Sequence, residues 1–204
     1  EEAGCPNIGE CWGRGTATFQ IMGDTCTRAC RYCAVTSGKR GEELDPLEPA
    51  KVAAAAERMG LRHVVITSVD RDDLPDKGAG HWAQTIRALR RRNPELQVEV
   101  LVPDFLGGEE AAMLTVLEAE PHVYNHNIET VRRIQPIVRI KGDYDRALWI
   151  LKRAKELWAE HFPEREPLLT KSGIIVGMGE TDDEVIDAMR DLRANDVDVV
   201  TIGQ

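Results

Sequence analysis

Short runs of β-branched and other apolar residues alternate along the chain with longer runs in which apolar residues recur every three or four positions. The short runs predict strands at residues 17–22, 63–69, 97–103, 123–129, 169–177 and 197–204. The longer runs predict helices at residues 48–59, 80–92, 109–118, 144–161 and 182–194. Because strands that alternate with helices pair in parallel, the pattern predicts an α/β fold, a partial (βα)6 barrel of the TIM type.

Two segments are expected in this chain. Residues 1–16 form an N-terminal cysteine-rich extension, and residues 17–204 form one barrel domain without a low-complexity linker. Thr181, before an acidic first turn, is predicted to cap a helix, and Gly60 is predicted to end one. In barrels of this type the chemistry lies at the carboxyl ends of the strands, so the polar residues that follow each strand are the first candidates for a site.

Composition and charge exclude some partners. The 204 residues contain 26 Lys and Arg against 35 Asp and Glu, which gives a net charge of −9. An acidic chain lacks the broad basic surface that neutralises nucleic-acid phosphates, so no nucleic-acid partner is expected. No run of 18 apolar residues is present, which predicts no membrane span.

Five cysteines lie within the first 33 residues, and the rest of the chain has none. An odd number of closely spaced cysteines fits metal ligation in a reducing compartment better than a disulfide framework, which favours a cytoplasmic location. The cysteines are Cys5, Cys11, Cys26, Cys30 and Cys33.

The last three of them form a C-x3-C-x2-C triplet directly after the first predicted strand. Three thiolates can bind three irons of a cubane iron–sulfur cluster, which leaves the fourth iron open to an external ligand. A structural zinc site is the alternative, although zinc sites usually add a second cysteine pair or histidines, and the first 60 residues contain no His.

Polar residues also mark two later strands. Alternation along residues 123–129 places Asn125, Asn127 and Glu129 on one face, where a purely structural strand would carry aliphatic residues. In the fifth strand, glycines at positions 173 and 177 remove side chains where the backbone could approach a flat ring closely. Both patterns are typical of a strand that binds a polar cofactor.

The triplet, with Tyr32 just before its last cysteine, resembles the signature of radical S-adenosylmethionine (radical SAM) enzymes. The resemblance implies that Cys26, Cys30 and Cys33 are the catalytic cysteines, which hold a 4Fe-4S cluster whose open iron binds SAM. An electron from that cluster would cleave SAM to a 5′-deoxyadenosyl radical that abstracts hydrogen. Tyr32 would flank the adenine.

Over essentially its whole length the chain is similar to the lipoyl synthase family. The likeness includes the C-x5-C pair Cys5 and Cys11 and the loop at residues 65–79. It implies that this pair belongs to a second, auxiliary 4Fe-4S cluster held by C-x4-C-x5-C and by a serine of a C-terminal segment. The first cysteine and that serine are absent from this sequence, so the auxiliary site is expected to be incomplete here.

The same resemblance implies roles in SAM binding for polar and glycine residues at the strand ends. Thr67 and Ser68 would hold the methionyl amino group, Arg139 a carboxylate, and Gly173 and Gly177 the adenine side. Asn127 and Glu129 are further candidates beside the cofactor.

The family inserts sulfur at two carbons of an octanoyl chain attached to a lipoyl carrier protein. Those carbon–hydrogen bonds are not acidic, so a side-chain base could not activate them and a radical is needed. The resemblance implies as partners an octanoylated glycine cleavage H protein or E2 lipoyl domain, and an electron donor such as ferredoxin or flavodoxin. Two alternatives stay open: another sulfur-inserting radical SAM enzyme (biotin-synthase-like or a methylthiotransferase), and a non-catalytic zinc module.

Overall fold

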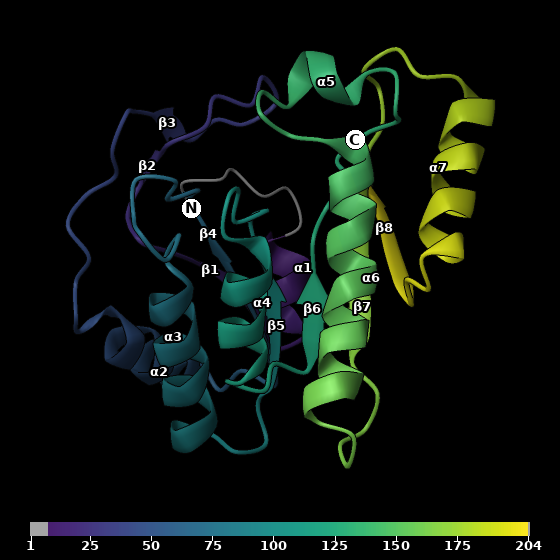
Figure 1. Ribbon diagram of the computed structural model, residues 1–204. Coiled ribbons are helices and arrows are strands. Elements are labelled where there is room, and N and C mark those ends of the chain that lie inside the picture. The colour runs from purple at the N-terminus through teal and green to yellow at the C-terminus, as the bar shows by residue number, and fades with distance from the viewer. Residues whose placement is uncertain (1–7, 204) are drawn as a thin grey trace. The chain divides into compact units, whose positions relative to one another are not determined.

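The computed structural model describes residues 8–203 (Figure 1). The chain forms two compact units. The first contains Glu1–Thr27 and Ala34–His122, and the second contains Arg28–Cys33 and Val123–Gln204.

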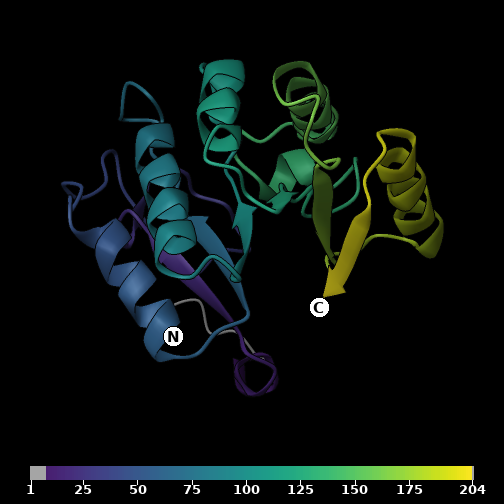
Figure 2. The same cartoon turned by 90° about the horizontal axis from the view of Figure 1, so that it is seen from below.

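Three parallel strands form the sheet of the first unit: β1 (Thr16–Ile21), β4 (His63–Ser68) and β5 (Gln97–Leu101). Helices α2 (Glu48–Arg58) and α3 (Ala79–Arg92) lie side by side along these strands (Figure 2). Apolar side chains from strands and helices, including Ile21, Ile66, Val98, Trp82 and Ile86, are fully buried and form the core of this unit. The remaining elements are α1 (Ile8–Gly13), α4 (Glu109–Leu117) and the short parallel strands β2 (Thr25–Cys26) and β3 (Thr36–Ser37).

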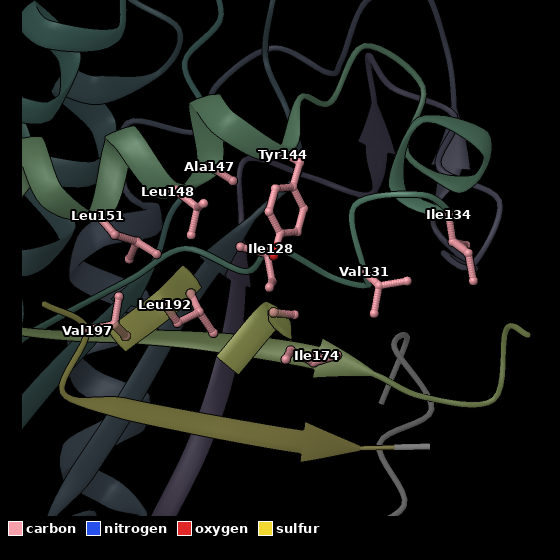
Figure 3. Close-up of a cluster of buried hydrophobic side chains, with 11 residues drawn as sticks. Ile128, Val131, Ile134, Tyr144, Ala147, Leu148, Leu151, Ile174, Leu192 and Val197 are labelled. Carbon is pink, nitrogen blue, oxygen red and sulfur yellow. The ribbon is translucent and has the colours of Figure 1, made fainter. Parts of the chain in front are cut away.

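The second unit is also parallel α/β, with β6 (Val123–Asn125), β7 (Leu169–Ile175) and β8 (Val199–Gly203). Its helices are α5 (Gln135–Val138), α6 (Tyr144–His161) and α7 (Asp182–Ala194). Figure 3 shows its core, in which Leu151 of α6, Ile174 of β7 and Leu192 of α7 pack with neighbouring apolar side chains. The core lies between β7 and the two long helices.

Both predicted helix ends are confirmed. The Thr181 hydroxyl accepts the N–H of Glu184, and the Glu184 carboxylate accepts the N–H of Thr181, which completes a capping box at the start of α7. Gly60 follows the end of α2 with a φ of 61°, a conformation that favours glycine.

The predicted α/β class is confirmed, and all of the predicted strands and helices are present, but several bounds were wrong. The fourth predicted strand, 123–129, ends at Asn125, and the fifth, 169–177, ends at Ile175. The last strand begins at Val199 rather than at residue 197. Period-two alternation continues past the end of β6, but Glu129 has a φ of 69°, which an extended strand does not allow. Short elements without a periodic pattern, α1, α5, β2 and β3, were not predicted.

In the part of the chain that the structure describes, no helix has the length and apolar character needed to cross a membrane.

His122 makes the stability of the first unit depend on pH. Its backbone N–H donates to Val98 O at 2.8 Å, and its Nδ1 accepts the N–H of Val98 at 3.0 Å. Burial, followed by the nearby Arg90, lowers the pKa of His122 below its ordinary value of 6.5. The folded chain therefore favours the neutral ring, whose stabilising contribution is complete above pH 6.5 and is lost as the pH falls through the lowered pKa.

We therefore expect the free energy of unfolding to decrease on acidification below pH 6.5, and His122→Asn to remove that part of the pH dependence. Urea unfolding at intervals between pH 5 and 8, about the range in which a histidine titrates, measures this. An unchanged pH profile in the variant would contradict the role assigned to His122.

Candidate functional site

None of the described cysteines takes part in a disulfide. Cys26 ends β2 in the first unit, whereas Cys30 and Cys33 belong to the second unit. Cys33 is exposed, and Cys26 and Cys30 are half-buried. Cys11 lies half-buried in α1, and Cys5 lies outside the described residues.

Backbone hydrogen bonds shape the loop of Cys30 and Cys33. The N–H of Cys33 donates to Cys30 O at 3.1 Å, which forms a tight turn between the two thiols. The N–H of Arg31 donates to Val138 O at 2.8 Å, at the last residue of α5. The short helix α5, which the sequence analysis missed, thus holds this cysteine loop in place.

Asp70, just beyond β4, contacts Cys26. Its backbone N–H donates to Cys26 Sγ at 3.3 Å, and its Oδ2 lies 3.8 Å from the same sulfur. Asp70 was not among the predicted site residues, although it follows Ser68 at the carboxyl end of a strand, where barrel sites lie. Its position after the strand end could have identified Asp70 as a candidate from the sequence.

Tyr32 lies within the electrostatic reach of two other predicted residues of the second unit. Its pKa is raised above the ordinary range, chiefly by burial and then by the negative charge of Glu129, while Arg139 opposes the shift. A hydrogen bond with the Cys30 side chain raises the pKa further. The structure therefore brings Cys30, Tyr32, Glu129 and Arg139 together, with Tyr32 kept as a neutral phenol.

The predicted row of polar side chains is not a regular strand face. After β6 ends at Asn125, the N–H of His126 still donates to Lys171 O, but the next pairing is made by a side chain. The Ser172 hydroxyl donates to His126 O at 3.0 Å and accepts the N–H of Ile128 at 3.2 Å. Asn125 is buried, whereas Asn127 and Glu129 are half-buried.

Gly173 leaves room for the side chain of Asn127. A Cβ on Gly173 would lie 2.7 Å from Asn127 Oδ1, closer than van der Waals contact allows. On the other side, Arg139 Nη1 donates to Asn127 O at 2.8 Å, and the Arg139 side chain is nearly buried. Asn127 is thus held in place by Gly173 and Arg139, two other residues predicted for the site.

Gly177 lies in the turn after β7 and not in the strand. Its φ of 102° belongs to the left-handed region that favours glycine. Its N–H and the N–H of Met178 both donate to the Glu180 carboxylate, the latter at 2.9 Å. These backbone donors hold the pKa of Glu180 below its usual range. The glycine at position 177 is explained by this turn.

Thr67 and Ser68 end β4, at the carboxyl edge of the first unit's sheet, and both are half-buried. The Ser68 Oγ atom is buried and makes no hydrogen bond within the described residues. A buried hydroxyl without a partner is costly, so this atom has capacity for a ligand.

The donor set at the cysteine triplet suits an iron–sulfur cluster. Thiols that are not in disulfides can deprotonate to thiolates, the ligands that such clusters prefer. Within residues 8–203, no three His, Cys, Asp or Glu side chains already surround a single metal position. The three thiols nevertheless supply the kind of ligand that such a cluster needs.

Comparison with known proteins gives the family. The profile of the radical SAM superfamily matches residues 21–192. A lipoyl synthase of Pyrobaculum calidifontis is 57% identical over the whole chain, and one of Caldanaerobacter subterraneus is 58% identical. The chain belongs to the lipoyl synthase family. It spans about two thirds of the length of these two relatives, 67% and 68%.

Solved structures support the fold assignment. The [FeFe]-hydrogenase maturase HydG superposes with a TM-score of 0.70 at 17% identity, over 92% of this chain and 42% of HydG. This likeness, together with the parallel strands of each unit, agrees with the predicted partial barrel. Membership of the lipoyl synthase family decides against the biotin-synthase-like, methylthiotransferase and zinc-module alternatives.

Proposed function

We propose that this chain carries the radical SAM core of a lipoyl synthase and takes part in sulfur insertion at two carbons of a protein-bound octanoyl chain. The observation that carries the proposal is the match of the whole chain to lipoyl synthases at 57% and 58% identity, with the three cysteines of the triplet present as thiols outside any disulfide. When bound, the cluster and SAM supply the radical that removes hydrogen from the unactivated chain.

Cys26, Cys30 and Cys33 would hold the cluster. None of the three side chains is fully buried: Cys33 is exposed, and Cys26 and Cys30 are half-buried. A cluster could therefore reach all three sulfurs. The turn between Cys30 and Cys33 keeps their separation short. Each thiolate would bind one iron and leave the fourth iron for SAM.

The residues grouped around Tyr32 would bind and orient SAM. Tyr32 is a neutral phenol beside Cys30, suited to packing against the adenine. Arg139 and Glu129 offer opposite charges beside it, suited to a carboxylate and to the ribose hydroxyls or sulfonium. Asn127 would form a hydrogen bond with the cofactor beside these residues. The hydroxyl oxygens of Thr67 and Ser68 would accept hydrogen bonds from the methionyl ammonium group.

Two further assignments concern the N-terminal segment. Residues 1–16 would be the auxiliary-cluster segment and residues 17–204 the radical SAM domain. Cys5 and Cys11 would contribute two thiolates to a second 4Fe-4S cluster, and Cys11 is a free, half-buried thiol in α1. Residues of α1 contact β1, so this segment is attached to the first strand of the domain.

As partners we propose an octanoylated glycine cleavage H protein or E2 lipoyl domain as substrate carrier, and ferredoxin or flavodoxin as electron donor. The family assignment supports both. We place the protein in the cytoplasm, since cysteines outside disulfides, such as those of the triplet, persist in a reducing compartment.

The test is metal analysis followed by product analysis of the anaerobically reconstituted chain. We expect about four irons and four sulfides per chain from the triplet, or about eight if Cys5 and Cys11 also support a cluster. With dithionite as reductant, SAM should be cleaved to methionine and 5′-deoxyadenosine. Zinc in place of iron, or intact SAM beside a formed cluster, would overturn the proposal. Incubation with an octanoylated H protein, followed by product analysis, then tests whether this protein is the substrate carrier.

A further inference from the structure

Hydrogen bonds join Cys26 and Thr27 to residues 70–72, which follow the end of β4. The Thr27 N–H and the Thr27 hydroxyl both donate to Asp70 O, each at 3.0 Å. The same hydroxyl accepts the N–H of Asp72 at 3.0 Å. We call this set, with the bond from Asp70 N–H to Cys26 Sγ at 3.3 Å, the Thr27 clasp.

The clasp restricts the position of the Cys26 sulfur. The Thr27 hydroxyl donates one hydrogen bond and accepts another. These two bonds fix the rotation of the side chain about its Cα–Cβ bond. Cys26 is the next residue in the chain, and its sulfur receives the Asp70 N–H directly. Because Asp70 follows Ser68 by two residues, the clasp ties the first cluster ligand to the strand end of Thr67 and Ser68.

Asp70 also acts on the sulfur electrically, in two opposing ways. Its N–H dipole points at Sγ and stabilises negative charge there, whereas its carboxylate Oδ2, 3.8 Å away, destabilises it. Hydrogen bonds to the sulfurs and the net charge nearby are the levers by which a protein sets the potential of an iron–sulfur cluster. In this chain, a hydrogen bond and a nearby negative charge therefore both act on the Cys26 sulfur.

We propose that the Thr27 clasp positions Cys26 and tunes the reduction of the cluster, with Thr27 and Asp70 as positioning residues that act through the Cys26 sulfur. This inference rests on the proposed function, because it requires a cluster on the triplet. The Asp70 N–H makes reduction easier, and the Asp70 carboxylate makes it harder. Their balance sets how readily an electron donor reduces the cluster.

Thr27→Val and Thr27→Ser form the first matched pair. Valine has the shape of threonine but no hydroxyl, so it loses two bonds of the clasp, whereas serine keeps the hydroxyl. At a fixed solution potential, we expect Thr27→Val to lower the ratio of reduced to oxidised cluster about threefold, because the N–H to sulfur bond weakens. Thr27→Ser should restore the parent ratio. Redox titration followed by electron paramagnetic resonance measures it.

Asp70→Asn and Glu95→Gln form the second pair. Asp70→Asn removes the charge beside Sγ and keeps the backbone N–H, so the ratio of reduced to oxidised cluster should rise about threefold. Glu95→Gln makes the same change of charge at an exposed position before β5 and should leave the ratio unchanged. If all of these variants titrate like the parent chain, the clasp has no tuning role and the inference is wrong.

A measurement on the cluster-free chain tests the clasp itself. Amide hydrogen exchange at Asp72 should become faster in Thr27→Val and stay at the parent rate in Thr27→Ser, because only valine removes the acceptor of that N–H. Equal exchange in both would contradict the clasp. Should Thr27→Val fail to fold, the redox titration of Asp70→Asn still tests whether Asp70 tunes the cluster. If the parent chain itself forms no cluster, the proposed function fails instead, and hydrogen exchange reports separately on the clasp.

Discussion

Cys33→Ser is expected to abolish SAM cleavage, with a loss of at least about 100-fold. Serine is a poor iron ligand at neutral pH because its hydroxyl stays protonated, so one of the three irons loses its protein ligand. The Cys33 side chain is exposed, so the substitution removes no core packing and the chain should fold as before. Loss of activity in a folded chain would therefore report on the cluster alone.

The measurement combines iron content, SAM cleavage under dithionite and the far-ultraviolet circular dichroism spectrum. Thr115→Ala is the control, since Thr115 lies on α4 and its hydroxyl donates to Ala111 O within its own helix. That variant should keep the parent iron content and rate. Cleavage of SAM by Cys33→Ser at the parent rate would remove Cys33 from the cluster.

Leu151→Ala is expected to destabilise the second unit by about 2–5 kcal/mol. Leu151 is fully buried in α6 and packs in the core that Figure 3 shows, with residues of β7 and α7 around it. Truncation to alanine removes apolar contacts from all of these elements and leaves a cavity that a close-packed core fills only in part. Urea unfolding at neutral pH measures the change in the free energy of unfolding.

Leu169→Ala is the matched control because it makes the same chemical change at the first residue of β7, where the side chain is 48% exposed. Its cost should stay near or below about 1 kcal/mol, in proportion to the apolar area that it buries. Equal losses in the two variants would show that Leu151 does not lie in a packed core.

The parallel α/β class and the family could be predicted from the sequence. Alternating strand and helix patterns persist over many residues, so each signal is strong and local. The triplet of Cys26, Cys30 and Cys33 lies within eight consecutive residues, and thiolates have few other roles at that spacing. Neither prediction needed contacts between distant parts of the chain.

The sequence also determined which end of β4 and β6 to search, but not what each residue does there. Asn127 and Gly173 were both selected for a cofactor, and the structure adds that the Asn127 amide fills the space that a side chain on Gly173 would need. Gly177 was selected for the same reason, and it also forms a turn with Glu180. A glycine signals close approach by some group, and only the fold identifies that group.

Tertiary structure alone decided where β6 ends and how the cysteine loop is held. The Ser172 hydroxyl replaces a ladder bond at Ile128, 44 residues away in the chain. Asp70 reaches Cys26 across 44 residues, and Val138 O receives the N–H of Arg31. Such bonds join single polar groups that carry no periodic pattern, so they become visible only when packing brings the segments together.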